Sequence, residues 1–304
     1  MTRPQILTLS IYLLPVALLA QHDAGRVVPS DRSIHVVAFG DYGTGSVHQM
    51  AVAQAIARRH AEDRFDFGLT MGDNFYLCGV RSIKDPKWKR RWEDLYSPLG
   101  IPFYTSLGNH DYGHPPAMCP AERGSPDVEV AYTSHSPSWR MPARYYTFKA
   151  GPVLFIAIDT EGWLPAQLAW IKETLAASAH DPEIKWRIVY GHHPIFTSGM
   201  HVNERRIGEL RTQLWPVLKA ANVDVFICGH DHDLEHLRTD GMDFLICGGG
   251  GAKLRKFPRQ EPFTVFSAVK YGFLDLTIDD HKFTARFLDT KLASLEDPPM
   301  VRVK

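Results

Sequence analysis

Net charge, paired cysteine motifs and long apolar runs are all scarce or absent in this chain of 304 residues. Lys and Arg together number 34, as do Asp and Glu, so no whole-chain field favours nucleic acid or a membrane surface, and we expect no nucleic-acid partner. The four cysteines include no Cys-x-x-Cys pair, which argues against a zinc ribbon, and the absence of Asn-x-Ser/Thr predicts no N-glycosylation. Gly and Pro follow no period, which excludes a collagen-like chain. An apolar fraction of 44% can bury a substantial core, which excludes disorder as the main state.

One apolar stretch stands at the start of the chain. Arg3 provides a positive charge, and Ile6–Ala20 is almost entirely apolar but shorter than the roughly 20 residues needed to span a bilayer. We therefore expect residues 1–20 to be a signal peptide and the protein to be secreted or periplasmic. A buried N-terminal strand or helix is the alternative. No later run approaches membrane-spanning length, so we expect no stable span after processing.

The cysteines divide into two kinds. Cys228 and Cys247 each end an apolar, strand-like run and are expected to be buried thiols on neighbouring strands. Cys78 and Cys119 lie in loop-like segments, so they are the better candidates if the chain forms a disulfide.

Polar motifs follow strand-like apolar runs at five places. Helical patterns are expected between these runs at about 46–62, 167–177 and 204–218. The runs and their motifs are Ile34–Phe39 with Gly40–Gly43, Phe67–Met71 with Gly72–Asn74, Pro102–Leu107 with Gly108–Asp111, Arg187–Tyr190 with Gly191–Pro194, and Val223–Cys228 with Gly229–His232. This alternation favours an α/β fold with a largely parallel sheet, where ligands gather beyond the carboxyl ends of the strands. We expect one domain whose single site is built from these five loops.

The five motifs contain the side chains that a two-metal site requires. Two ions about 3.5–4 Å apart can neutralise the charge of a phosphoester and supply a nucleophile, and they need oxygen and imidazole ligands with one bridging carboxylate. His230 and His232 lie two residues apart on an extended segment, so their side chains share one side of the chain. The candidate ligands are Asp41, Asp73, Asn109, His192, His230 and His232.

The order of these motifs resembles that of the calcineurin-like metallophosphoesterases. The resemblance runs from about residue 34 to residue 288, and it is strongest to the purple acid phosphatases of the small, tartrate-resistant type. It rests on Gly40-Asp41-x-Gly43, Gly72-Asp73-Asn74-x-Tyr76, Gly108-Asn109-His110-Asp111, Gly191-His192-x-Pro194 and Gly229-His230-x-His232. It implies an α/β (α+β in some schemes) four-layer α/β/β/α sandwich, with two mixed sheets flanked by helices. The implied domain covers residues 31–290, followed by a C-terminal tail at 291–304.

The same resemblance implies a role for each matching residue. Asp41, Tyr76 and His232 are expected to hold Fe(III). Asn109, His192 and His230 are expected to hold a divalent ion (Fe, Zn or Mn), and Asp73 to bridge the pair. The implied catalytic residues are His110, which contacts phosphate and protonates the leaving group, His201, which faces the substrate, and Asp111, which orients His110 by a hydrogen bond.

The implied function is that of an exported acid phosphatase, a phosphoric monoester hydrolase that uses a metal-bound hydroxide on small phosphorylated substrates. One alternative is a related binuclear phosphoesterase that acts on phosphodiesters or nucleotides with Mn, Zn or Fe(II). A more distant alternative is a metal-binding surface protein without turnover. The sequence does not determine the oligomeric state, the physiological substrate or the divalent ion.

A few other features call for an interpretation. The basic run Lys84–Arg91 includes Trp88, and the spacing to Trp92 predicts a docked helix whose charges face water rather than a nucleic-acid patch. The run Gly248–Lys253 lacks the spacing of a P-loop and is expected to be a loop that approaches the site closely. His193 is expected to be structural, because its side chain should point away from that of His192.

Two residues depart from the tartrate-resistant pattern. Tyr42 stands where that type usually has Trp, and Asp233 stands where it usually has Asn. Neither belongs to the expected ligand set.

Overall fold

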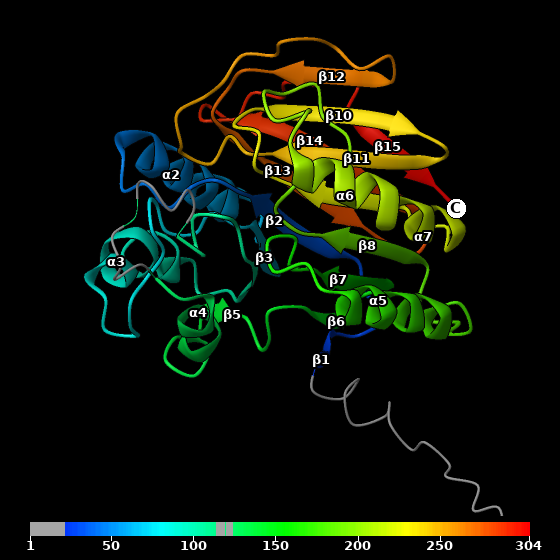
Figure 1. Cartoon of the computed structure of the whole chain (residues 1–304), viewed down its shortest axis with the longest axis horizontal. Coiled ribbons are helices and arrows are strands. Elements are labelled where there is room, and N and C mark those ends of the chain that lie inside the picture. Colours follow the sequence, from blue (N-terminus) through cyan, green and yellow to red (C-terminus); the bar gives the residue numbers. More distant parts are fainter. Residues whose placement is uncertain (1–21, 114–118, 120–123) are drawn as a thin grey trace, which may run out of the picture.

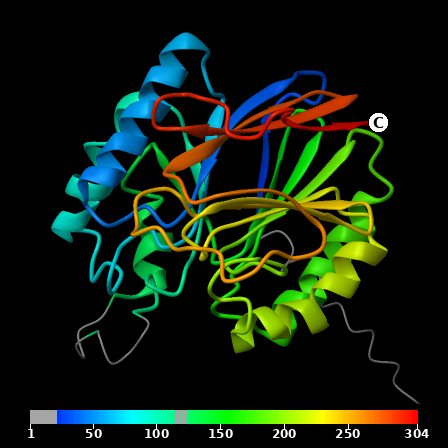
Figure 2. The ribbon, with the colours of Figure 1, turned by 90° about the horizontal axis from the view of Figure 1, so that it is seen from above.

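Two β-sheets lie face to face at the centre of the molecule, between two groups of helices (Figure 1, Figure 2). The computed structural model describes residues 22–113, 119 and 124–304, so the expected signal peptide lies outside the described residues. Within the described part, no helix is both long and apolar enough to cross a membrane. The arrangement is a mixed α/β architecture with two mixed sheets, as the family resemblance implies.

The seven-stranded sheet carries the first three motifs. Its strand order is β15-β14-β13-β2-β3-β4-β5, with β2, β3, β4 and β5 parallel. The strands are β2 (Ile34–Phe39), β3 (Phe67–Met71), β4 (Phe103–Ser106), β5 (Trp139–Arg140), β13 (Gly272–Ile278), β14 (Lys282–Asp289) and β15 (Met300–Val303).

The eight-stranded sheet carries the last two motifs. Its order is β1-β6-β7-β8-β9-β11-β10-β12, with β7, β8, β9 and β11 parallel. The strands are β1 (Asp23–Val28), β6 (Tyr146–Ala150), β7 (Val153–Ala157), β8 (Trp186–Tyr190), β9 (Val225–Cys228), β10 (Leu234–Thr239), β11 (Met242–Cys247) and β12 (Thr264–Ala268).

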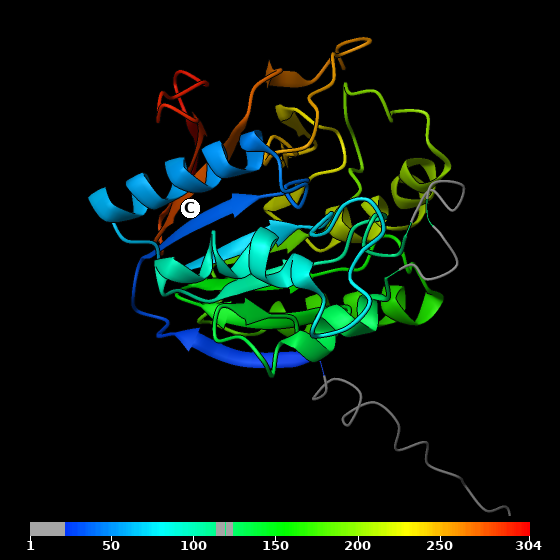
Figure 3. The same cartoon turned by 90° about the vertical axis from the view of Figure 1, so that its left-hand side faces the viewer.

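Helices cover the outer face of each sheet. One group lies on the seven-stranded sheet: α2 (Val47–Glu62), α3 (Pro86–Trp88) with a π-helical turn at Lys89–Glu93, a 3₁₀ turn at Ser97–Leu99, and α4 (Pro126–Tyr132). The other group lies on the eight-stranded sheet: α5 (Pro165–Ser178), α6 (Arg205–Gln213) and α7 (Trp215–Ala220). Figure 3 shows α2 lying across the end of the molecule beside β2.

The core has one layer between the sheets and another beneath the second helix group. Phe67 of β3 packs edge-on against Phe148 of β6 and Phe155 of β7, with ring centroids 5.6 and 5.5 Å apart. β2 and β3 are buried along their whole length because both faces of the sheet are covered. Trp170 of α5 and Leu210 of α6 belong to the outer layer.

Most expected elements appear, and the site strands divide between two mixed sheets, as the family resemblance implies, rather than forming the one largely parallel sheet that the alternation of strands and helices favoured. The folded region also extends beyond the predicted limits of 31 and 290. β1 pairs with β6, and the expected tail contains β15, which pairs with β14. Arg302 of β15 donates to Asp243 Oδ2 of the other sheet over 2.6 Å. These contacts hold the C-terminal segment against the domain, which apolar patterning alone did not reveal.

Candidate metal centre

The five motif loops meet at one place where the carboxyl ends of strands from both sheets come together. Main-chain hydrogen bonds join the loops: Asp41 N donates to Gly72 O over 3.1 Å, and Gly229 N donates to His192 O over 3.0 Å. Across the sheets, His230 N donates to Asp41 Oδ2 over 2.8 Å. The site therefore depends on the packing of the two sheets as well as on each strand.

Asp41, Tyr76 and His232 form one group of potential ligand atoms. The Tyr76 hydroxyl donates to Asp41 Oδ1 over 3.2 Å and lies 3.1 Å from His232 Nε2. His232 Nε2 lies 3.4 Å from the same Asp41 oxygen. Since Nδ1 of His232 is 2.9 Å from Lys253 O, Nε2 is the nitrogen that faces the other two groups.

Asn109, His192 and His230 form a second group beside the first. His192 Nε2 lies 3.0 Å from Asn109 Oδ1 and 3.1 Å from His230 Nδ1. Nδ1 of His192 is 2.7 Å from Met71 O, and this contact directs Nε2 into the site.

Asp73 connects the two groups. Its Oδ1 lies 3.4 Å from His192 Nε2. One ligand atom each from Asp41, Asp73 and His192 lie within 4.8 Å of one another. This arrangement places a carboxylate where a residue that bridges two ions must stand.

The backbone at three of these residues is unusual. Asp41, Asp73 and His230 have φ angles of 56°, 53° and 69°, which lie in the left-handed region that non-glycine residues seldom adopt. Such conformations cluster at functional sites, where surrounding contacts hold them in place. Each of the three residues stands two positions after the end of a strand, where the left-handed backbone directs its side chain toward the other potential ligands.

Two glycines leave room for the carboxylates. A Cβ on Gly108 would lie 2.3 Å from Asp73 Oδ1, and a Cβ on Gly229 would lie 2.3 Å from Asp41 Oδ2. Both distances are far below van der Waals contact, so only glycine allows this close approach. Gly108 and Gly229 thus make room for carboxylates that come from other motif loops.

Burial and neighbouring charges tune these groups in different directions. Burial raises the pKa of Asp73, but His192 and His110 lower it by more, so the net shift is downward. Burial, His193 and His192 hold the pKa of His230 well below its usual range. A carboxylate and a neutral imidazole are the forms that bind a metal ion.

The donor set fits two metal ions. It combines carboxylate, amide, phenol and imidazole groups from loops that bring their ligand atoms together. All of these residues except Asn109 are at most 8% exposed. Hard oxygen donors with imidazoles suit Fe, Mn or Zn. The seven side chains are Asp41, Asp73, Tyr76, Asn109, His192, His230 and His232.

His110 lies at the edge of this group, and its expected partner is corrected by the structure. His110 Nδ1 lies 2.7 Å from Leu77 O, while its backbone N–H donates to Asp73 Oδ1 over 2.9 Å. Asp111 does not orient His110. Its carboxylate accepts from Gly108 N, from Phe75 N and from the backbone and side chain of Asn74.

Asp111 therefore holds the loops together from below rather than touching a catalytic group. It is fully buried, and burial with the nearby Asp73 raises its pKa to about 6. The prediction failed because sequence adjacency does not reveal which way a carboxylate turns.

His201 is oriented by a residue that the sequence analysis did not assign. His201 Nδ1 lies 2.7 Å from Asp231 Oδ1, and Thr197 Oγ1 donates to the other Asp231 oxygen over 2.6 Å. Asp231 stands between two candidate ligands, His230 and His232, in the fifth motif. This position was the one feature of the sequence that could have indicated a role for Asp231 in the site. Glu204 was also missed, and its Oε2 lies 2.7 Å from His230 Nε2.

A cavity of about 470 Å³ opens above these residues, and we call it the main cavity. It is lined by residues of the candidate centre and its neighbours: Asp73, Asn109, His110, His201, His230 and His232. Five further charged residues line it, and we call them its rim: Glu161, Glu204, Arg205, Arg206 and Arg255. His193 also lines it, and its ring centroid lies 4.3 Å from that of His230, so this histidine is nearer the site than expected.

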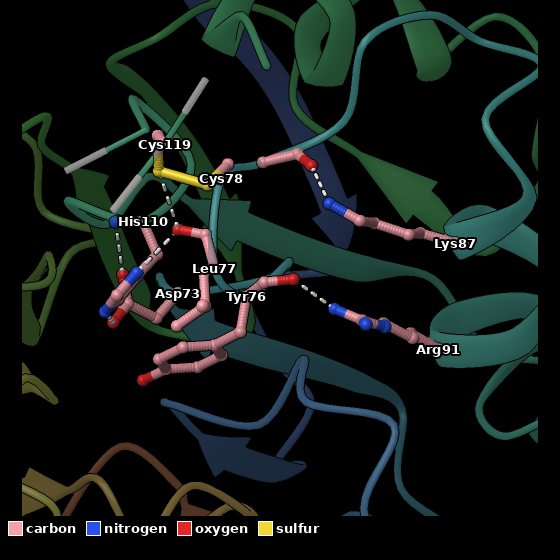
Figure 4. Close-up of a disulfide and its surroundings, with 9 residues drawn as sticks. Asp73, Tyr76, Leu77, Cys78, Lys87, Arg91, His110 and Cys119 are labelled. Atoms are coloured by element: carbon pink, nitrogen blue, oxygen red, sulfur yellow. Dashed lines mark hydrogen bonds and ion pairs between the residues drawn. A yellow bond between two sulfur atoms is a disulfide. The ribbon is translucent and has the colours of Figure 1, made fainter. Parts of the chain in front are cut away.

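The loop that carries Tyr76 is held from two sides, as Figure 4 shows. Cys78 forms a disulfide with Cys119, the pair that the sequence favoured for a disulfide. On the other side, Arg91 Nη1 donates to Gly43 O over 2.8 Å and also to Tyr76 O, and Lys87 donates to Gly79 O.

These basic contacts partly correct one expectation. Trp88 and Trp92 are buried as the helical spacing predicted, and Lys89 and Arg90 face water. Arg91, however, turns toward the site loop. The other cysteines agree with expectation, because Cys228 and Cys247 are buried free thiols on the paired strands β9 and β11.

The remaining features also have structural roles. The Tyr42 hydroxyl donates to Asn74 Oδ1 over 2.9 Å beneath the site. Asp233 is fully buried. The glycine-rich loop approaches closely, as expected: a Cβ on Gly250 would lie 2.2 Å from Gly40 O.

Comparisons with known proteins agree with this geometry. The profile of the Calcineurin-like phosphoesterase family matches residues 34–234. Tartrate-resistant acid phosphatase type 5 of Rattus norvegicus is 31% identical over 281 residues, which cover 81% of this chain and 79% of that protein. Purple acid phosphatase 7 of Arabidopsis thaliana is 30% identical, covering 74% of this chain and 72% of that protein.

Two solved structures share the fold. GAP50, described as the anchor in the inner membrane complex of Plasmodium, has a TM-score of 0.75 at 24% identity and covers 89% of this chain and 88% of its own. Purple acid phosphatase PPD1 from yellow lupin (Lupinus luteus) has a TM-score of 0.68 at 19% identity and covers 89% of this chain and 54% of its own. At these identities the likeness concerns the fold alone.

The chain belongs to the calcineurin-like phosphoesterases, and within them to the purple acid phosphatases. It is therefore an enzyme of the class that hydrolyses phosphate esters, and this family implies a centre of two metal ions.

Proposed function

We propose that this protein is an exported acid phosphatase that hydrolyses phosphate monoesters at a centre of Fe(III) and a divalent ion. The observation that carries the proposal is the position of the Tyr76 hydroxyl, 3.2 Å from Asp41 Oδ1 and 3.1 Å from His232 Nε2. A phenol beside a carboxylate and an imidazole is a donor set that favours a ferric ion.

The proposal assigns the ligands to two ions. Asp41, Tyr76 and His232 would hold Fe(III). Asn109, His192 and His230 would hold Fe, Zn or Mn in the divalent state, with Asp73 shared between the ions. When bound, such a pair supplies charge neutralisation for the phosphoryl group and activation of water.

The chain's own residues would complete the reaction. His110 has its Nδ1 near Leu77 O, so its Nε2 is the nitrogen that can donate a proton to the leaving oxygen. His201 has its Nδ1 near Asp231, so its Nε2 faces the main cavity, where Arg255 Nη1 contacts it. A phosphate bound there would contact this pair of side chains. Arg255, which lines the same cavity, favours an anionic substrate.

Absorption spectroscopy tests the metal assignment. We expect the purified, mildly oxidised protein to show a visible phenolate-to-iron band that Tyr76→Phe abolishes. Tyr42→Phe is the matched control, because it removes another buried hydroxyl that lies outside the proposed ligand set, and it should keep the band. A colourless wild type that binds two metals and cleaves phosphodiesters instead would contradict the proposal and favour the related binuclear phosphoesterase.

The proposed export rests on separate support. The N-terminal apolar segment has the pattern of a signal peptide, and the Cys78–Cys119 disulfide suits an oxidising compartment. We expect the protein recovered from the periplasm or medium of its source cells to begin near residue 21. Recovery of a chain that retains its first twenty residues in the cytosol would contradict export.

A further inference from the structure

A second cavity adjoins the main cavity at the candidate centre. It has a volume of about 560 Å³, and we call it the cationic cavity. The two cavities share His110, His232 and Arg255 in their walls. A phosphoryl group held at His110 would therefore have two directions in which the rest of its substrate could extend.

The cationic cavity differs from the main cavity in charge. Arg91, Lys253 and Arg255 line it, and the described lining contains no Asp or Glu. The main cavity, in contrast, includes Glu161 and Glu204 in its rim. An anionic group is thus favoured on one side of the centre and less so on the other.

None of the three cations forms a direct ion pair among the described residues, although the charge of Asp85 reaches Arg91 and those of Glu204 and Asp233 reach Arg255. Among the described residues, none of Arg91, Lys253 and Arg255 has a carboxylate within 4.0 Å. Arg205 and Arg206, also at the rim of the main cavity, both pair with Glu209. Unpaired cations directed at a cavity are free to bind an anionic ligand, whereas paired ones must first lose their partner.

Arg255 occupies the junction between the cavities. Its backbone N donates to His232 O over 3.1 Å, and its Nη1 contacts His201. The guanidinium is thus tied to the residue proposed to face the phosphate while its remaining N–H groups stay available. Leu77 and Ala252 add apolar surface to the same cavity, which suits a short carbon skeleton.

From these observations we propose that the cationic cavity binds a second anionic group on the leaving-group side of the substrate. The preferred substrates would then be small phosphate monoesters that carry a further phosphate or carboxylate, with Arg255 as the specificity-determining residue and Lys253 assisting. This inference rests on the proposed phosphomonoesterase function. Arg91 contributes charge, but its Nη1 is already engaged by Gly43 O and Tyr76 O.

The test compares two substrates that differ by one carboxylate: phenyl phosphate and 3-carboxyphenyl phosphate. Hydrolysis of either substrate breaks the bond between phosphorus and the aryl oxygen, and the rate is measured from the phosphate released. We expect wild-type kcat/KM to be about tenfold higher for the carboxylated ester, because a charge-assisted contact is worth about that factor. Most of the difference should appear in KM.

Substitutions then locate the preference. Arg255→Gln should bring the ratio of the two kcat/KM values close to one, and Lys253→Gln should lower it by a smaller factor. Arg259→Gln is the matched control, because Arg259 is an exposed arginine on the same loop that pairs with Glu261 outside the cavity. It should keep the wild-type ratio.

The outcomes separate this inference from the proposed function. If the wild type cleaves neither ester, the phosphomonoesterase proposal fails. If it cleaves both equally well, or if Arg255→Gln and Lys253→Gln both keep the preference, the proposal for the cationic cavity is overturned while the phosphatase stands. Should Arg255→Gln fail to fold, Lys253→Gln alone decides, through whether the ratio falls.

Discussion

Glu204 Oε2 lies 2.7 Å from Nε2 of His230, at the opposite side of the ring from the nitrogen that faces His192. A carboxylate in this position accepts a hydrogen bond from Nε2–H of the imidazole. This hydrogen bond fixes the tautomer in which the Nδ1 lone pair can bind an ion. Glu204 ends the loop before α6, so it connects the wall of the main cavity to a proposed metal ligand.

Removing this carboxylate should weaken the divalent site. We expect Glu204→Ala to lower the affinity for the divalent ion about 10–100-fold, with Glu204→Gln intermediate, as measured by competition with a chelator. Glu173→Ala is the control, because Glu173 is exposed on α5 away from the site. Unchanged affinity in Glu204→Ala would show that the ring is held in place without this contact.

His110→Ala should separate catalysis from metal binding. The backbone N–H of His110 that contacts Asp73 remains in this variant, whereas the side chain proposed to protonate the leaving group is lost. We expect kcat to fall by about 10²–10⁴ while metal content stays constant. The control is His135→Ala, which removes an exposed histidine beyond α4. Equal turnover, or loss of the ions, would refute the role given to His110.

Arg91→Gln should disturb the tyrosine loop from a distance. Arg91 joins Gly43 O to Tyr76 O, so its loss leaves two carbonyl groups without a charged donor. We expect a loss of about 1–3 kcal/mol in the free energy of unfolding and a shift or weakening of the visible band. Arg90→Gln provides the comparison, since the neighbouring Arg90 is exposed. Identical effects in the two variants would mean that bulk charge, not these contacts, is responsible.

The disulfide should stabilise the loops that follow β4. Cys78 and Cys119 are 41 residues apart, and the segment between them includes Asn109 and His110. On the loop-closure model, replacing both cysteines by serine should cost about 3–4 kcal/mol in urea unfolding. Reductant should produce the same loss in the wild type and no further change in the double variant. An unchanged unfolding midpoint in both experiments would contradict a stabilising role.

His236 should make stability depend on pH. Burial lowers the pKa of His236, but hydrogen bonds to Asp243 and Glu296, both 2.7 Å away, raise it by more, so the net shift is upward. A raised folded-state pKa contributes stability that is fully present below the unfolded value near 6.5 and is lost as pH rises through the folded value.

We therefore expect the Tm of the wild type to fall as pH is raised from below 6.5 through the folded-state pKa of His236. His236→Gln should have a lower Tm at acidic pH and a flatter profile. A difference between the two proteins that is constant across this pH range would contradict the assignment.

Local pattern was sufficient for most individual elements. The expected strands at Ile34–Phe39 and Phe67–Met71 coincide with β2 and β3, because continuous runs buried on both faces end abruptly at glycine. α2 begins one residue after Ser46, whose hydroxyl accepts from Gln49 N over 3.3 Å at the helix start. The motif residues after each strand likewise predicted the site, since the ends of parallel strands are where side chains converge.

Side-chain direction and long-range partners were not contained in those patterns. Asp111 is next to His110 in the chain, but its carboxylate accepts hydrogen bonds from Gly108 of its own loop and from Asn74 and Phe75 of another. Arg91 lies on a helical turn whose spacing predicted a solvated charge, yet it reaches a carbonyl 48 residues away in sequence. No local period encodes such contacts, because they depend on which loops pack together.

The sequence by itself determined the chemistry: five loops with carboxylate, amide and imidazole groups, and Tyr76 as a phenol beside them. Only the tertiary structure decided which strands belong to which of the two sheets, with β2 to β4 in one and β8 to β9 in the other, and that Glu204, Asp231 and Arg255 join the site. The physical reason is that strand and ligand preferences follow from neighbouring residues, whereas the face-to-face packing of two sheets follows from burial of the whole core.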